Sequence, residues 1–321
     1  MKVLVTGGAG FIGSNIAKEL VKDSDVERVT VIDNLITGLE PNLDDLKFNK
    51  KFTFIKGDIR DYKLCEELAS HHSHICHQAA LGSVPRSIEN PVASNDHNIN
   101  GTLNIFTAAK NTSIKKIVFA SSSSVYGDDQ TLPKVESKTG KVLSPYALTK
   151  KTKEEYARLF GELYNLQIIG LRYFNVFGPF QNPKGAYAAV IPLFIRMIMD
   201  NQSPTIHGEG DQSRDFTYID NVVSANILAL KTESKFENSE IFNIAYGGKT
   251  SVKDLYFKIA EILESNLQPI YGEPRIGDIK HSLADISKIK ETLNYKPIVS
   301  IDEGLKRTVN WFKHYYEKQP T

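Results

Sequence analysis

The fold is decided at residues 3–13, which read Val-Leu-Val-Thr-Gly-Gly-Ala-Gly-Phe-Ile-Gly. The apolar run Val3–Val5 predicts a buried strand, and the glycines after it let the chain turn into a helix from about Gly13 to Val21. Similar apolar runs alternate with amphipathic stretches further on, and predict strands at 29–32, 52–55, 74–77, 117–120 and 168–171. Strands that alternate with helices in this way predict a doubly wound α/β fold, in which helices cover both faces of a parallel sheet.

The regular alternation of predicted strands and helices ends after about Gly178. Proline and glycine become frequent, and strands no longer alternate regularly with helices. We therefore predict a main domain over 1–178 and a smaller, mixed α/β domain that faces the substrate over 179–321. The segments 216–219 and 242–245 are apolar enough to return to the main sheet, which would make the boundary discontinuous.

The overall composition narrows the classes of function. Thirty-nine basic residues against thirty-eight acidic ones give a net charge of +1. This charge is too small to attract nucleic acid or an anionic membrane surface. No stretch approaches the roughly 20 apolar residues that cross a bilayer, and the N-terminus enters the first strand without a leader segment. The two cysteines, Cys65 and Cys76, indicate no disulfide framework. These features predict a cytoplasmic protein.

The glycine-rich turn also predicts a cofactor site. Gly7 and Gly10 let the backbone approach a pyrophosphate, Gly13 lets the helix pack on the sheet, and the helix N-terminus supplies N–H groups for the anion. Asp33 follows twenty residues later, at the end of the second predicted strand, where a carboxylate can bind a ribose 2′-hydroxyl and repel a 2′-phosphate. The alternative, a structural turn and a surface carboxylate, explains less, because strand, loop and helix stand in the required order. We predict that the cofactor is NAD.

A tyrosine and a lysine four residues apart predict the chemistry. Tyr146 and Lys150 would share one face of a helix, where the ammonium can lower the pKa of the phenol and hold a cofactor ribose. Tyr146 could then exchange a proton with a substrate hydroxyl. Four serines, Ser121–Ser124, leave the end of a preceding strand and would lie near the pair. No suitably placed histidine completes an acyl-transfer triad, so this group indicates hydride transfer at a carbinol.

The spacing G-x-x-G-x-x-G resembles the extended short-chain dehydrogenase/reductase family, which has a Rossmann-type fold and whose members mostly act on nucleotide sugars. The resemblance extends over essentially the whole chain. It implies that Ser122 bonds the reacting oxygen beside Tyr146, and that Asp58, in Gly57-Asp-Ile-Arg60, contacts the adenine. It also implies cofactor contacts from Phe11, Ile12, Asn34, Ile59, Gln78, Ala79, Ala80, Asn98, Lys150 and Tyr173.

The same resemblance assigns the substrate. Arg214 and Arg275 match arginines that hold a diphosphate in the family. Asp278 matches a carboxylate that binds the nucleotide ribose, and Asn175 matches a residue that contacts the pyrophosphate or the sugar. Segments 185–192 and 277–285 resemble epimerases that prefer N-acetylated sugars, and Ser282 stands where enzymes restricted to glucose and galactose carry tyrosine. The remaining residues implied to lie at the substrate are Ser83, Ser87, Ser123, Ala189 and Val190.

The serines at 122–124 also distinguish this chain from family members that catalyse related reactions. Dehydratases of the family carry Thr-Asp-Glu where residues 122–124 stand, and decarboxylases usually carry Glu at the position of Ser124. The resemblance therefore implies reversible 4-epimerisation of UDP-N-acetylglucosamine and UDP-N-acetylgalactosamine, through a 4-keto sugar and with tightly bound NAD. A UDP-glucose/UDP-galactose 4-epimerase remains the first alternative, followed by a related dehydratase or decarboxylase. A non-catalytic NAD-binding regulator is disfavoured because Tyr146 and Lys150 are both present.

Two further expectations concern partners and metals. The helices expected at 91–110 and 145–164 correspond to a four-helix dimer interface in the family, so the resemblance implies a homodimer. The run His71–His77 looks like a metal cluster, but strand alternation would point His74 and Cys76 away from His77. We predict no metal site.

Overall fold

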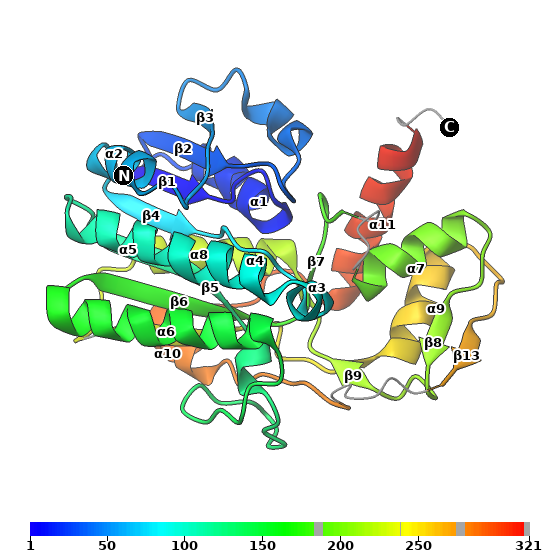
Figure 1. Ribbon diagram of the computed structural model, residues 1–321. Helices are drawn as coiled ribbons and strands as arrows, with labels where there is room; N and C mark the ends of the chain where they lie inside the picture. The colour runs from blue at the N-terminus through cyan, green and yellow to red at the C-terminus, as the bar shows by residue number, and fades with distance from the viewer. Residues whose placement is uncertain (183–188, 238, 274–279, 318–321) are drawn as a thin grey trace.

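The computed structural model describes residues 1–182, 189–237, 239–273 and 280–317 (Figure 1). Its centre is a seven-stranded sheet with the strand order β11-β6-β5-β4-β1-β2-β3, and every neighbouring pair is parallel. The strands are β1 (Lys2–Thr6), β2 (Arg28–Asp33), β3 (Phe52–Lys56), β4 (His74–His77), β5 (Lys116–Ser122), β6 (Gln167–Tyr173) and β11 (Glu240–Ile244). The predicted doubly wound α/β fold is confirmed.

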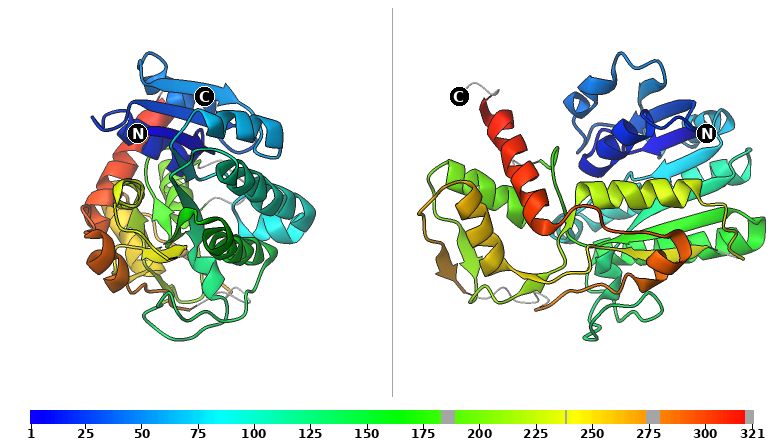
Figure 2. Two further views of the ribbon diagram at one scale, coloured as in Figure 1. Left: turned by 90° about the vertical axis from the view of Figure 1, so that its left-hand side faces the viewer. Right: turned by 180° about the vertical axis from the view of Figure 1, so that it is seen from behind.

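Helices cover both faces of this sheet. One face packs against α2 (Tyr62–Ser70), α5 (Gly101–Lys110) and α6 (Pro145–Tyr164), and the other against α1 (Phe11–Leu20) and α8 (Ile219–Lys231). Seen from behind in Figure 2, α8 crosses the face opposite to α5 and α6. Along β1, Val3 and Val5 enter one apolar core and Leu4 enters the other, as side-chain alternation requires of a strand that is buried on both sides.

The remaining elements lie around the main sheet or beyond the carboxyl ends of its strands. Short elements around the main sheet are η1 (Glu40–Leu46), α3 (Val84–Glu89), α4 (Pro91–Asn95), the π-helical turn η2 (Asp96–Asn100), η3 (Ser123–Tyr126) and α10 (Ser287–Leu293). Helices α7 (Val190–Met199), α9 (Val252–Ile262) and α11 (Ile301–Glu317) lie to the right of the main sheet in Figure 1. Three two-stranded sheets join β7 (Val176–Phe177) to β10 (Thr217–Tyr218), β9 (Ser213–Arg214) to β12 (Thr250–Ser251), and β8 (Thr205–His207) to β13 (Ile270–Gly272).

The two segments that were expected to rejoin the main sheet behave differently. Residues 240–244 do so as β11, which pairs with β6 at the edge. Residues 217–218 pair with β7 outside the sheet, which corrects the expectation for 216–219; the strand is two residues long because α8 begins at Ile219. The division of the chain into two domains near residue 178 stays a prediction.

Candidate active site

A cavity of about 310 Å³ opens at the carboxyl ends of the central strands. Fourteen residues predicted at the cofactor or at the reacting centre line it: Gly7, Gly10, Phe11, Ile12, Gly13, Asp33, Asn34, Ile59, Gln78, Ala79, Ala80, Tyr146, Lys150 and Tyr173. Ser121 and Gly57, which belong to two segments named from the sequence, also line it. Lining residues that the sequence did not single out are Ile32, Thr37, Leu81, Gly82, His97 and Ala120. The cavity thus joins the glycine-rich turn to the tyrosine and lysine.

The backbone of the glycine-rich turn is packed too closely for a side chain at Gly7 or Gly13. Gly7 has a φ of 68°, and a Cβ on it would stand 2.7 Å from the backbone of Ala79. A Cβ on Gly13 would stand 2.3 Å from the carbonyl oxygen of Gly7. The first turn of α1 therefore sits directly against the turn and faces the cavity, an arrangement that suits a pyrophosphate.

Asp33 is held at the end of β2 by backbone groups. Its carboxylate accepts hydrogen bonds from the N–H of Ala9 at 3.0 Å and of Leu35 at 2.8 Å. Burial raises the pKa of Asp33, and these N–H groups counteract the rise. The carboxylate is thereby fixed at the cavity wall, where it can accept hydrogen bonds from a ribose diol.

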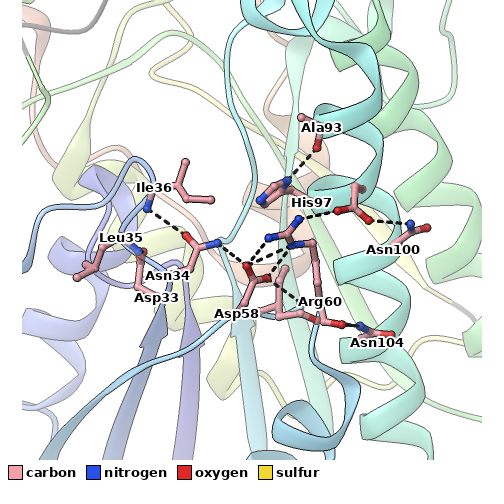
Figure 3. Close-up of polar contacts among 12 residues, drawn as sticks. Asp33, Asn34, Leu35, Ile36, Asp58, Arg60, Ala93, His97, Asn100 and Asn104 are labelled. Atoms are coloured by element: carbon pink, nitrogen blue, oxygen red, sulfur yellow. Dashed lines mark hydrogen bonds and ion pairs between the residues drawn. The ribbon is translucent and has the colours of Figure 1, made fainter.

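Asp58 lies beside the cavity in a network of polar contacts (Figure 3). Asn34 donates to its Oδ2 at 2.9 Å, and Arg60 contacts it at 2.8 Å while reaching Asp96 of η2 at 2.7 Å. The hydrogen bonds from Arg60 hold the pKa of Asp58 well below its usual range. Asp58 is therefore a fixed anion between the end of β2 and the helix that follows α4.

His97 faces the cavity, whereas the predicted Asn98 does not line it. The Asn98 side chain is fully buried and makes two hydrogen bonds with the backbone of Leu81. Its Oδ1 accepts from the N–H of Leu81 at 2.7 Å, and its Nδ2 donates to the carbonyl oxygen of Leu81 at 3.1 Å. His97 donates from Nδ1 to Ala93 O at 2.9 Å, and its buried Nε2 has no hydrogen-bond partner among the described residues. The π-helical turn turns the helix by one extra residue here, which sequence spacing did not reveal.

Tyr146 and Lys150 come together as predicted, but not with the predicted electrostatics. The Lys150 ammonium stands 5.6 Å from the centre of the Tyr146 ring and donates to the carbonyl of Ala120 at 2.9 Å. Burial lowers the pKa of Lys150 to about 8, although the Glu154 carboxylate raises it. Burial also raises the pKa of Tyr146, while a hydrogen bond with Ser122 lowers it by less. Desolvation thus outweighs the one hydrogen bond that lowers the pKa of Tyr146, in place of the net lowering that was expected from Lys150.

A second cavity, of about 220 Å³, gathers predicted substrate residues from three segments. Asn175, Val190 and Arg214 line it together with Leu193, Phe194, Thr205, Ile206, His207, Gln212, Phe216 and Val252. Ser282 donates its N–H to Ser213 O at 3.0 Å, which places it next to the strand that carries Arg214. The predicted Arg275 and Asp278 lie outside the described residues.

The other predicted substrate residues that the structure describes do not line either of the two cavities. Ser83 caps α3 with a φ of 97°, Ser123 opens η3, and Ala189 caps α7. Ser87 is fully buried on α3 and is not among the described residues that line either cavity. Among the described residues, no group of three His, Cys, Asp or Glu side chains is arranged to hold a metal ion. The described helices include none with the length and apolar character to cross a membrane.

Comparison with known proteins relates this geometry to one family. The model of the NAD dependent epimerase/dehydratase family matches residues 3–245. The UDP-N-acetylglucosamine 4-epimerase of Methanobrevibacter ruminantium, solved in complex with UDP-N-acetylmuramic acid, is 42% identical over 98% of both chains, with a TM-score of 0.92. The UDP-glucose 4-epimerase of Thermotoga maritima with UDP-glucose is 36% identical over 98% of this chain and 100% of its own, with a TM-score of 0.91. The UDP-glucuronic acid 4-epimerase of Bacillus cereus, solved with UDP-glucuronic acid and NAD, is 31% identical over 98% and 100%, also with a TM-score of 0.91.

Proposed function

This chain belongs to the NAD-dependent epimerase/dehydratase family, and we propose that it is a UDP-sugar 4-epimerase that uses NAD. One observation carries the proposal. Tyr146 and Lys150 line the same cavity as the glycine-rich turn and Asp33, so an acid–base pair and a dinucleotide site share one space. Relatives that span the whole chain act on UDP-sugars, and one of them was solved with NAD.

The residues of the first cavity fit NAD. The turn at Gly7 and the N-terminus of α1 would hold the pyrophosphate, and Asp33 the adenosine ribose. Asp58 would accept from the adenine amine, and Lys150 would bind the nicotinamide ribose. When bound, NAD⁺ supplies a hydride acceptor next to the sugar carbon and later returns the hydride.

The protein's own side chains would move the proton. As phenolate, Tyr146 takes the proton of the sugar 4-hydroxyl while the C4 hydrogen leaves as hydride, and C4 becomes a ketone. Ser122, which hydrogen-bonds Tyr146, would hold the same oxygen. After the keto sugar turns over, the hydride returns to its other face and Tyr146 gives the proton back. Protons and electrons balance, and no net oxidation occurs.

We propose that the second cavity receives the nucleotide diphosphate and that N-acetylated sugars are preferred. Arg214 offers a guanidinium suited to phosphate oxygens, and the apolar walls at Ile206 and Phe216 suit a base. The small Ser282 beside the Arg214 strand leaves volume for a 2-acetamido group. The Methanobrevibacter relative, which acts on an N-acetylated sugar, supports this preference.

The alternatives to an N-acetylated substrate are other UDP-sugars. UDP-glucose and UDP-glucuronic acid are bound by the Thermotoga and Bacillus relatives. A dehydratase or decarboxylase is disfavoured by Ser123 and Ser124, which offer no carboxylate.

We also propose a homodimer formed through the outer face of α3, α4 and α6. Large apolar side chains are exposed there, namely Val84, Ile88, Val92, Leu148, Leu159 and Leu163. A surface of this kind is typical of a protein–protein interface. Light scattering on the purified protein would give twice the mass of the 35.9 kDa chain, and a monomer mass would refute this interface.

The activity is tested by incubating the purified protein with UDP-GlcNAc, UDP-glucose or UDP-glucuronic acid, without added reductant, and separating the products by chromatography. Conversion of UDP-GlcNAc to an equilibrium mixture with UDP-GalNAc, faster than conversion of the other two, is expected. Conversion of UDP-glucose or UDP-glucuronic acid alone would refute the N-acetyl preference and keep the epimerase. No conversion of any of the three with NAD⁺ supplied would refute the proposed function.

A further inference from the structure

The helix that carries the proposed catalytic tyrosine begins with a serine cap and a proline. Ser144 caps α6, and Pro145, which has no N–H, occupies its first position. The hydroxyl of Ser144 accepts from Ala147 N at 3.1 Å, and its carbonyl accepts from Leu148 N at 2.9 Å. The N–H of Tyr146 remains as a donor without a partner inside the helix.

A serine from another helix satisfies this donor. The hydroxyl oxygen of Ser87, on α3, accepts from Tyr146 N at 3.0 Å. The same hydroxyl donates to Val84 O at 2.7 Å, so its hydrogen is engaged and its oxygen is turned toward Tyr146. Ser87 is 0% exposed, which keeps water from replacing either contact.

This contact joins two walls of the first cavity. The chain from Ala79 to Gly82 lines the cavity and leads directly into α3, and Tyr146 lines the same cavity from α6. We propose that Ser87 is a positioning residue, which fixes the backbone of Tyr146 against the loop 79–82 and so sets the place of the phenolic oxygen beside the sugar. The inference rests on the proposed function, and it gives Ser87 a place behind the tyrosine instead of beside the sugar.

The structure separates this role from general support of the fold. Lys150 lies one helical turn further along α6 and has its own anchor at Ala120 O. Loss of the Ser87 contact should therefore displace Tyr146 and leave the lysine in place. The tyrosine would lose alignment with Ser122, and turnover should suffer while cofactor binding does not.

The test compares Ser87→Ala with Ser94→Ala. Ser94, on the neighbouring helix α4, is 1% exposed, and its hydroxyl has no hydrogen-bond partner among the described residues, so it controls for loss of a buried hydroxyl. For Ser87→Ala we expect kcat to fall about 10- to 100-fold, with KM and bound NAD within about twofold of wild type. The hydrogen bond with Ser122 lowers the pKa of Tyr146, so its loss should raise that pKa. The acid limb of the profile of kcat against pH should therefore move to higher pH. Hydrogen exchange at the Tyr146 amide should become faster.

Two results would overturn the inference. The first is a loss of kcat in Ser87→Ala no larger than in Ser94→Ala. The second is a parallel decline of kcat, bound NAD and thermal stability with an unmoved pH limb, which would mean structural support only. If Ser87→Ala does not fold, Ser87→Cys, with a weak acceptor of similar size, is measured in its place and should show a smaller loss of the same kind. Inactivity of the wild type on every UDP-sugar would refute the proposed function itself, whereas an active wild type with a fully active Ser87→Ala refutes only the role of Ser87.

Discussion

A buried ion pair fastens α6, the helix that carries Tyr146, to the sheet, and its removal should destabilise the protein strongly. Glu154 of α6 and Arg172 of β6 form a two-pronged contact, with N–O distances of 2.9 and 2.8 Å and side chains only 5% and 4% exposed. Glu154→Gln would leave the guanidinium buried without a carboxylate, which costs about 3–5 kcal/mol. Arg172 would keep the carbonyl of Glu136 at 3.0 Å and the ring of Tyr126 at 4.9 Å. We therefore expect a loss near 3 kcal/mol, the lower end of that range.

The neighbouring residue provides the control. Glu155 points outward, 54% exposed, and pairs only loosely with Lys151 at 3.9 Å and Arg158 at 3.5 Å. Glu155→Gln should change the free energy of unfolding by at most about 1 kcal/mol. Urea unfolding followed by circular dichroism measures both variants, with the denaturant slope checked for constancy. Equal midpoints for the two variants, or a Glu154→Gln midpoint close to wild type, would refute the reasoning from burial.

Three further predictions concern the cofactor cavity. Tyr146→Phe should lower kcat by about 10²- to 10⁴-fold while the purified protein retains its NAD, measured by the absorbance of released cofactor; unchanged turnover would contradict the assigned base. Gly13→Val would place a Cβ 2.3 Å from Gly7 O, so it should lose bound NAD and melt at a lower temperature, and a variant purified with full NAD would contradict the packing argument. Because the pKa of Lys150 is about 8, its ammonium is lost as the pH rises through 8, and kcat should fall on that alkaline side; a kcat profile that stays flat from pH 7 to pH 9 would show that its charge does not matter.

The sequence was most informative where function depends on neighbours along the chain. The turn at Gly7, the start of α1 and Asp33 at the end of β2 lie within one strand–helix–strand unit, so their spacing alone placed them at one cavity. The alternation of strands and helices likewise predicted the parallel sheet, because a parallel pair needs a crossover between its strands. Local order along the chain was therefore enough to predict which of these residues line the cavity.

It was less informative where a turn changes the helical phase or where a strand is short. In the π-helical turn at 96–100, His97 lines the cavity and Asn98 is buried against Leu81, and the contact of Asn98 with the cofactor stays a prediction. The segment 216–219 was apolar enough for the main sheet, yet it forms a two-residue strand beside β7. Apolar character indicates burial but does not say against which element.

Helix α6 shows why the spacing of residues in the sequence does not predict the protonation states of buried side chains. Lys150, Lys153 and Glu154 follow Tyr146 on one helix, and each contacts a different strand of the main sheet. Lys150 donates to Ala120 O, Glu154 binds Arg172, and Lys153 lies 3.2 Å from the ring nitrogen Nε2 of His77. Burial holds the pKa of Lys153 well below its usual value, and the nearby Lys150 adds to this effect. Two buried lysines and one buried carboxylate thus share a single helix, and only the carboxylate has a full counter-charge. For the tyrosine at the head of this helix, burial by the tertiary fold raises the pKa, and the hydrogen bond with Ser122 opposes that rise.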